Sequence, residues 1–329
     1  MTIILSVVTA DYAIQVSDRL LTRKLTTLTT PEQVFYEPWD KAANKSVIVL
    51  GSDGLFAMGY TGPAHVAGAP TDGWIAEFVA GQELGANQIR PDIGAMQISQ
   101  GTSTNRVLAV RFPELAQRVG EMDSAGKLTD RLSIDVVGLR WKDLNKLAWP
   151  AYGRIGWDAD EDRNIFGMSS QRWGYENKNY ARALGPKQNI AQKLLRERFR
   201  GADLSSKEGT AAVLIDILRS LPSEDPTVGR DCLVTTIQGV PPHVHIKYEP
   251  YDLTQMSVEF KSGRTVTVEA ACTPWIITPD KLFAPAAMNV QVLPFSSSGF
   301  DFEVEGPEST MDDFLFVSSQ PRRLFPERT

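Results

Sequence analysis

The residue with the clearest chemical potential is Thr2, which stands directly behind Met1. Removal of Met1, which a small second residue permits, would leave a hydroxyl and a free α-amine on one threonine. A threonine hydroxyl is a poor nucleophile until a base takes its proton, and an N-terminal amine can be that base. The ordinary pKa of the amine, about 7.7–8.0, would fall beside a cation. Thr2 is therefore a candidate nucleophile for amide hydrolysis, and its plainer interpretation is an ordinary strand residue.

Strand patterns dominate the first sixty residues and would place Thr2 at the start of a buried strand. Residues 3–18 carry two β-branched, apolar runs that predict a pair of strands. Residues 45–50 and 55–60 flank a Gly-Ser-Asp-Gly turn, which is a strong hairpin signal. Residues 22–39 between these pairs are polar, contain two prolines and predict a loop. Thr2 would thus lie in a block of four strands.

Helical spacing follows in two pairs of segments, with strands between and after them. Thr71 or Asp72 is expected to cap the first helix, Pro113 to interrupt the second, and Ser205 or Ser206 to cap the fourth. The predicted helices cover residues 71–79, 104–122, 186–199 and 206–221. The later predicted strands cover residues 132–141, 146–155, 232–238 and 243–249. Blocks of strands and helices in this order predict an α+β layered fold.

Two charged residues and a glycine stand at the ends of the early strands. Asp18 ends the second strand, sixteen residues after Thr2, Lys45 starts the third strand, and Gly62 follows the fourth. Together with Thr22, this arrangement resembles the opening of proteasome β subunits and their bacterial relatives, which are N-terminal-nucleophile (Ntn) hydrolases. The resemblance covers about residues 2–250 and is well marked only at the two ends of that range.

The resemblance implies a four-layer αββα sandwich for residues 2–250, with residues 251–329 as a β-rich C-terminal extension. It implies that Thr2 attacks an amide or peptide bond, that Asp18 orients Lys45, and that Lys45 supplies positive charge. The N–H of Gly62 would belong to the oxyanion hole, and Thr22 would contact the substrate backbone.

The resemblance further implies chemistry without a metal or an organic cofactor. It implies a peptide or amide substrate and a homo-oligomer. Trp74 and Phe78 lie on a predicted helix that could serve both the core and a subunit contact.

The sequence departs from the family pattern at two places. Pro186 stands where the family has a serine that assists the nucleophile, in Gly-Pro-Lys at residues 185–187. Glu224 and Thr227 are the candidates to replace the family's supporting aspartate and serine, although Asp225 is equally well placed. Three functions therefore stay open: a threonine-dependent peptidase, a catalytically inactive assembly protein that kept the fold, and a small-molecule amidase of the Ntn group.

Other polar clusters favour plainer interpretations. Asp158, Asp160 and Asp162 alternate as in a calcium loop, but Arg163 and Ser169 stand where that loop needs glycine and glutamate, which predicts a solvated turn. His243 and His245 alternate on a predicted strand without a third metal ligand. His65 follows Gly62 closely in the sequence and could line the active-site cleft.

Composition limits the compartment and the partners. The net charge of −6 and the lack of a basic cluster argue against a nucleic-acid partner. The two cysteines, Cys232 and Cys272, form no disulfide framework and predict free thiols in a reducing compartment. No apolar run has the length of a membrane helix, and the start lacks the features of a signal peptide. These features predict a cytoplasmic protein without a membrane partner.

Overall fold

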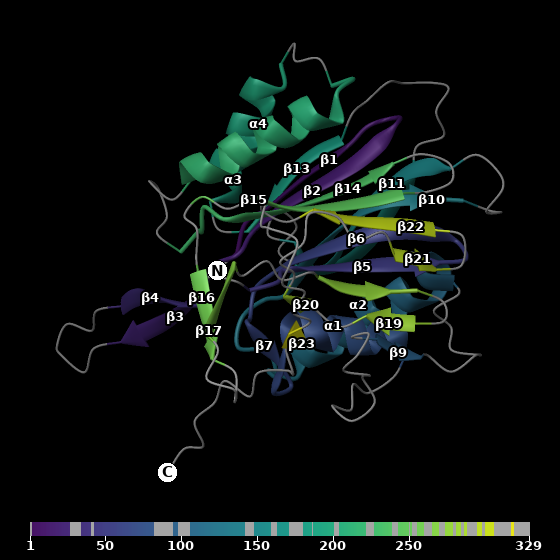
Figure 1. Ribbon diagram of the computed structural model, residues 1–329. Coiled ribbons are helices and arrows are strands. Elements are labelled where there is room, and N and C mark those ends of the chain that lie inside the picture. The colour runs from purple at the N-terminus through teal and green to yellow at the C-terminus, as the bar shows by residue number, and fades with distance from the viewer. Residues whose placement is uncertain are drawn as a thin grey trace.

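The computed structural model gives a mixed α/β fold with several sheets (Figure 1). It describes residues 2–26, 34–40, 43–81, 95–97, 106–141, 148–158, 163–170, 180–185, 187–200, 204–221, 227–238, 243–249, 251, 255–259, 265–269, 274–278, 281–283, 286–287, 295–297, 300–305 and 317–318. Within these ranges the prediction of a chain that mixes strand and helix blocks is confirmed.

The first large sheet has seven strands in the order β13-β1-β2-β14-β15-β22-β21. Its strands are β1 (Ile4–Val8), β2 (Tyr12–Asp18), β13 (Tyr180–Leu184), β14 (Cys232–Gln238), β15 (His243–Glu249), β21 (Phe295–Ser297) and β22 (Phe300–Glu305). All neighbours are antiparallel except β15 and β22. The β1–β2 register sets Ile4 opposite Ser17, so the start of β1 lies beside the end of β2.

The second large sheet has eight strands in the order β12-β11-β10-β6-β5-β18-β19-β9. Its strands are β5 (Ser46–Gly51), β6 (Gly54–Thr61), β9 (Ala95–Gln97), β10 (Ser133–Arg140), β11 (Trp149–Asp158), β12 (Arg163–Ser170), β18 (Trp275–Ile277) and β19 (Lys281–Phe283). The β5–β6 hairpin closes at Gly51 and Gly54, as the turn signal predicts. Residues after position 250 thus supply strands to both large sheets.

Helices cover the outer side of each large sheet (Figure 1). They are α1 (Thr71–Ala80), α2 (Phe112–Ser124) with the preceding π-helical turn η2 (Val107–Arg111), α3 (Gln188–Arg198) and α4 (Lys207–Ser220). The apolar faces of α1 and α2 pack with residues of β5, β6 and β10, and those of α3 and α4 with residues of β1, β2 and β14. Among the described residues, no helix combines the length and apolarity needed to cross a membrane.

A third apolar cluster lies between the two sheets, because alternate residues of a strand face opposite sides. On β5, Val47 and Val49 belong to the cluster with α1 and α2, whereas Ile48 and Leu50 pack with residues of the first sheet. The partners of Ile48 and Leu50 include Val8 and Ala13 of the first two strands. The central strands of both sheets therefore bury both faces.

Polar side chains replace apolar ones between the sheets at the end nearest Lys45. Gln15 accepts a hydrogen bond from Ser46 (3.3 Å) and donates to Ser6 (3.4 Å) and to the Asp135 carbonyl (3.3 Å). Burial raises the pKa of the Asp135 carboxyl to about 6, although the hydroxyl of Ser6 lowers it. The polar part of the core thus directly adjoins the residue that follows Lys45.

The segment expected as a loop at residues 22–39 is instead a hairpin of β3 (Leu21–Thr26) and β4 (Val34–Asp40). The loop prediction was wrong because it gave too much weight to proline. Pro38 lies opposite Thr22 in a two-stranded sheet, where a residue without an N–H is tolerated on an outer edge. The other small sheets are β7 (His65–Val66) with β8 (Ala69–Pro70), β16 (Gln255–Glu259) with β17 (Thr265–Glu269), and β20 (Ala286–Ala287) with β23 (Val317–Ser318).

Helix ends match the sequence in part. Ser206 caps α4 by accepting from the N–H of Gly209, as predicted, and Pro113 lies in the first turn of α2. The cap of α1 is Pro70, one residue before the predicted Thr71. The strands that were not predicted include β12 and β13, since neither carries a clear alternation of apolar residues.

Candidate active site

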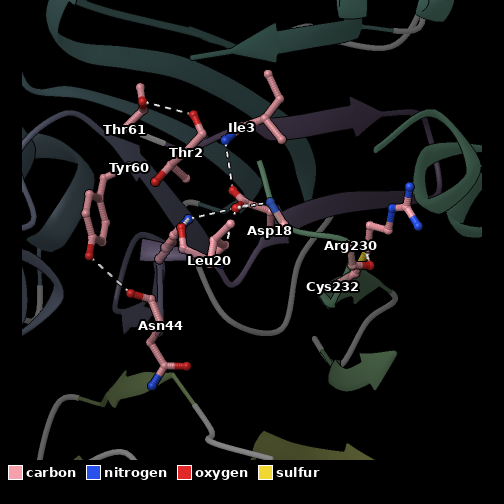
Figure 2. Close-up of polar contacts among 11 residues, drawn as sticks. Thr2, Ile3, Asp18, Leu20, Asn44, Tyr60, Thr61, Arg230 and Cys232 are labelled. Carbon is pink, nitrogen blue, oxygen red and sulfur yellow. Dashed lines mark hydrogen bonds and ion pairs between the residues drawn. The ribbon is translucent and has the colours of Figure 1, made fainter. Parts of the chain in front are cut away.

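Thr2 lies two residues before the first residue of β1 and is 2% exposed. Its carbonyl oxygen accepts a hydrogen bond from the hydroxyl of Thr61 (3.0 Å), at the end of β6 in the second sheet (Figure 2). On its other side lies Gly185, which has a φ of +119° and leaves no room for a Cβ beside the Thr2 carbonyl. The start of the chain is thus held between the two sheets.

The Asp18 carboxylate is the centre of the site and is fully buried. Its Oδ1 accepts from the N–H of Ile3 (2.9 Å), the residue after Thr2. Its Oδ2 accepts from Lys45 Nζ (2.9 Å) and from the N–H groups of Gly229 (3.0 Å) and Leu20 (3.2 Å). One carboxylate therefore joins the backbone beside Thr2 to the Lys45 ammonium, as Figure 2 shows for Ile3 and Asp18.

Lys45 precedes β5 and is also fully buried, as one half of an ion pair with Asp18. It donates a further hydrogen bond to the Leu20 carbonyl. Burial lowers the pKa of Lys45, and the nearby Asp18 and Asp40 carboxylates oppose that effect, while the Arg19 guanidinium adds to it. The site thus holds a desolvated ammonium whose field is little screened by water.

Gly62 and Thr22 lie on two chain segments that contact Thr2 and Lys45, through the hydroxyl of Thr61 and the carbonyl of Leu20 respectively. Gly62 directly follows Thr61 and has a φ of +125°, and a Cβ there would collide with the Arg131 carbonyl. Thr22, in β3, is two residues beyond Leu20 and is half-buried. The roles that the resemblance implies for these two residues stay predictions.

The expected supporting residues are described only in part. Thr227 is 1% exposed and lies two residues before Gly229, whose N–H binds Asp18. Glu224 and Pro186 lie outside the described residues. Thr227 is therefore close in sequence to the site, and the effect of the Pro186 departure stays untested.

Several residues of the site were not predicted from the sequence. Thr61 binds the Thr2 carbonyl, and the Tyr60 hydroxyl donates to the Asn44 carbonyl (3.1 Å), next to Lys45. Arg19 is fully buried and lies over the ring of Tyr248 at 4.6 Å. The sequence does show an arginine directly after Asp18, at the end of an apolar strand, and this position could have marked Arg19 as a residue of the site. The hydroxyl contacts of Thr61 and Tyr60 have no comparable sequence signal.

The other polar candidates are not among the hydrogen-bond partners of the Asp18 carboxylate or lie outside the described residues. The half-buried His65 has its ring 5.9 Å from that of Trp39, and burial lowers its pKa. His243 and His245 are half-buried on β15. Asp160 and Asp162 lie outside the described residues, as do the side chain of Asp158 and all of Cys272. Among the described residues, no group of three or more His, Cys, Asp and Glu side chains could hold a metal ion.

Neither a family model nor a curated protein matches the sequence. Solved structures that resemble the chain include Anbu (ancestral beta-subunit) from Yersinia bercovieri, with a TM-score of 0.44, 10% identity and coverage of 72% of this chain and 81% of that one. Anbu from Hyphomicrobium sp. strain MC1 gives 0.45, 12%, 75% and 88%, and its Gly-1 mutant gives 0.43, 12%, 76% and 88%.

These neighbours correct the resemblance to proteasome β subunits. Anbu proteins are proteasome-like but form a distinct family. With TM-scores below 0.5 and at most 12% identity, the fold is only loosely related even to Anbu. The assignment to the proteasome β-subunit family was therefore wrong.

Proposed function

We propose that this protein is an Ntn-type amide or peptide-bond hydrolase whose nucleophile is Thr2. Removal of Met1 would make Thr2 the first residue and free its α-amine. The observation that carries the proposal is the position of Asp18, whose carboxylate binds both the Ile3 N–H and the Lys45 ammonium. A buried cation that one carboxylate joins to the backbone next to a threonine that can become N-terminal would support amine-assisted attack.

The reaction would proceed through an ester on Thr2. The Thr2 hydroxyl oxygen attacks the substrate carbonyl carbon, and the hydroxyl proton passes to the Thr2 α-amine. The resulting ammonium donates that proton to the leaving amine as the C–N bond breaks. Water then hydrolyses the ester and restores the hydroxyl. Lys45 would favour the neutral amine and the developing alkoxide, and Asp18 would hold Lys45 in place.

The remaining site residues would bind the substrate. The Gly62 N–H would stabilise the oxyanion, a contribution of about 3 kcal/mol to the barrier in related chemistry. Thr22 would contact the substrate backbone, and Thr227, with Glu224, would support Asp18. The hydrolase unit would be a four-layer αββα sandwich of residues 2–250, supported by the helix-sheet-sheet-helix order of the apolar clusters. Residues 251–329 would be an extension that lends strands to both sheets.

The first test is covalent labelling of Thr2. The purified protein should lack Met1, and a β-lactone or an epoxyketone should add one equivalent to Thr2 because these electrophiles capture a threonine hydroxyl. Intact mass and peptide mapping locate the adduct. Thr9→Ala, at a buried threonine beyond the far end of β1, is the matched control and should label normally, whereas Thr2→Ala should not label.

Two outcomes would contradict this function. Retention of Met1, or an adduct elsewhere in the chain, would exclude Thr2 as the nucleophile. No adduct with several chemotypes would favour the inactive assembly protein. Turnover of small amides without turnover of peptides would instead favour the small-molecule amidase.

We also propose a homo-oligomer of cytoplasmic subunits. Trp74 is in the core, so α1 offers mainly Phe78 for a contact. The β3–β4 hairpin offers more, since four of its large apolar side chains are 37–50% exposed: Leu25, Phe35, Tyr36 and Trp39. Light scattering should therefore give a mass well above 36.3 kDa, and a clean monomer would contradict the proposal. The free, buried Cys232 is consistent with a reducing compartment, which cell fractionation can test.

A further inference from the structure

A short strand from the C-terminal part of the chain lies beside the strand that begins after Lys45. β18 pairs in parallel with β5, and its register sets Trp275 opposite Val47. The other neighbour of β5 is β6, so β18 covers an edge that would otherwise be open. The backbone that follows Lys45 is thus fixed on one side by residues that lie more than two hundred positions away.

Trp275 also reaches the start of α1. Its side chain is buried, its indole nitrogen lies 3.8 Å from where a Cβ on Gly73 would be, and its N–H donates to the carboxylate of the neighbouring Asp72. Asp72 is the second residue of α1, and burial raises its pKa to about 6, although the N–H groups of Asp72 and Gly73 and the indole lower it. Because the carboxylate is desolvated, losing the indole N–H would leave it without one of few partners.

Tyr60 carries this contact from α1 to the segment that holds Lys45. Its hydroxyl accepts from the backbone N–H of Asp72 and donates to the Asn44 carbonyl (3.1 Å). The N–H of Tyr60 binds the carbonyl of Lys45 itself (3.0 Å). Figure 2 shows the Tyr60 ring extending to Asn44. The backbone before and at Lys45 is therefore tied to Asp72 through one tyrosine.

We propose that Trp275 is a positioning residue for Lys45, acting through Asp72 and Tyr60, so that the C-terminal part of the chain completes the candidate active site. Trp275, Asp72 and Tyr60 are called the Trp275 relay. The contacts of the relay stand on their own, and only their effect on catalysis rests on the function proposed above.

The relay matters because Lys45 has little freedom to correct a shift of its backbone. Its Nζ must reach Asp18 at 2.9 Å inside a site without exposed side-chain surface. A small displacement of Asn44 would lengthen that contact and move the positive charge away from Thr2. Misplacement of a group that acts in the transition state lowers the rate more than it weakens substrate binding.

The decisive variant is Trp275→Phe, which keeps an aromatic ring and removes the indole N–H. The Lys45 ammonium signal, observed by NMR with 15N-labelled lysine, should shift or broaden. The rate of β-lactone labelling at Thr2 should fall about tenfold, the equivalent of one buried hydrogen bond. The pH profile of labelling should move to higher pH, because a Thr2 amine farther from Lys45 keeps a higher pKa.

The matched control is Trp141→Phe. Trp141 is likewise buried, but it follows the end of β10 that is remote from Ser133 and Thr61. The Trp141→Phe variant should leave both the Lys45 signal and the labelling profile unchanged. A variant that merely loosened the core would lower the melting temperature without moving either readout.

A second variant keeps the proposal testable if Trp275→Phe does not fold. Tyr60→Phe removes the hydroxyl that joins Asp72 to Asn44 and should give the same shifts. Its control is Tyr12→Phe, which removes a buried hydroxyl bound to the Leu204 carbonyl (2.6 Å) and Thr210 (2.7 Å) at the far end of β2. The double variant Trp275→Phe/Tyr60→Phe should be no slower than either single variant, because the residues act as one unit.

The two readouts separate the relay from the proposed function. An unchanged Lys45 signal in both Trp275→Phe and Tyr60→Phe would overturn the relay, whatever Thr2 does. A changed Lys45 signal in a protein whose Thr2 never labels would support the relay and reject the hydrolase. Additive losses of labelling in the double variant would also overturn the relay, since independent residues would then be acting.

Discussion

Lys45→Ala is expected to reduce labelling and turnover at Thr2 by a factor on the order of 10⁴, the loss seen when one member of a cooperating catalytic group is removed. The physical reason is the position of Lys45, whose fully buried ammonium binds Asp18 at 2.9 Å. Without that charge, the Thr2 amine would be protonated more readily and the alkoxide would lose its stabilisation. The measurement is the rate of β-lactone labelling by intact mass.

Asp18→Asn should give a similar loss, and the two changes should not add. Asp18 keeps Lys45 charged and directed, so removing Lys45 leaves Asp18 little to contribute. The double variant should therefore be about as slow as Lys45→Ala alone. The matched control is Lys247→Ala, which breaks a partly exposed lysine-glutamate pair of 3.0 Å on β15 and should label normally. Near-normal activity of Lys45→Ala would reject this assignment and make Lys41, which lies outside the described residues, the next lysine to test.

The sequence allowed the charged residues of the site to be predicted, but not the uncharged polar groups that contact them. Asp18 and Lys45 could be singled out because their positions at the ends of apolar strands, together with their spacing from Thr2, resemble the opening of proteasome β subunits. Thr61 and Gly229 could not, since their contacts depend on a hydroxyl and an N–H that many residues could supply. Gly229 meets Asp18 across more than two hundred residues, and no local pattern reports such a distance.

The fold shows the same limit. β-branched, apolar runs predicted β1 and β2, a turn signal between two apolar runs predicted β5 and β6, and helical spacing with Ser206 predicted α4. The β3–β4 hairpin was missed because prolines outweighed its alternation, although edge strands accept proline. β18 was missed for another reason. Three residues, Trp275–Ile277, carry too little pattern to predict a strand, and only their pairing with β5 makes them one.

The largest expected change in stability comes from Asp18→Ala, which should lower the free energy of unfolding by about 3–5 kcal/mol at pH 7. The substitution leaves the Lys45 ammonium buried without its carboxylate. It also removes the acceptor for the N–H groups of Ile3, Leu20 and Gly229. Urea unfolding followed by circular dichroism measures the change.

Two further variants separate the lost charge pair from lost packing. Asp18→Ala/Lys45→Met removes both charges and should recover a large part of the stability, because the cost lies mainly in the unpaired cation. Lys193→Ala breaks an exposed pair with Glu197 at 3.9 Å and should change the unfolding free energy by less than about 0.5 kcal/mol. Equal destabilisation in the single and double variants would show that the charge of Lys45 is not the cause.

The stability of Asp18→Ala should depend on pH in a direction that the pKa of Lys45 determines. Burial already lowers the pKa of Lys45 from its ordinary 10.5, and Asp18 opposes that effect, so the pKa of Lys45 should fall further in the variant. The unfolded state then binds more protons than the folded state at any pH between the folded pKa and 10.5, and stability rises with pH across that interval. The deficit of Asp18→Ala relative to the wild type should therefore shrink as the pH rises from 7 through the interval in which Lys45 has lost its proton in the folded variant but still holds it in the folded wild type. A deficit that stays constant or grows over this range would mean that Lys45 finds another partner when Asp18 is absent, and the ion pair would then not be what holds the site together.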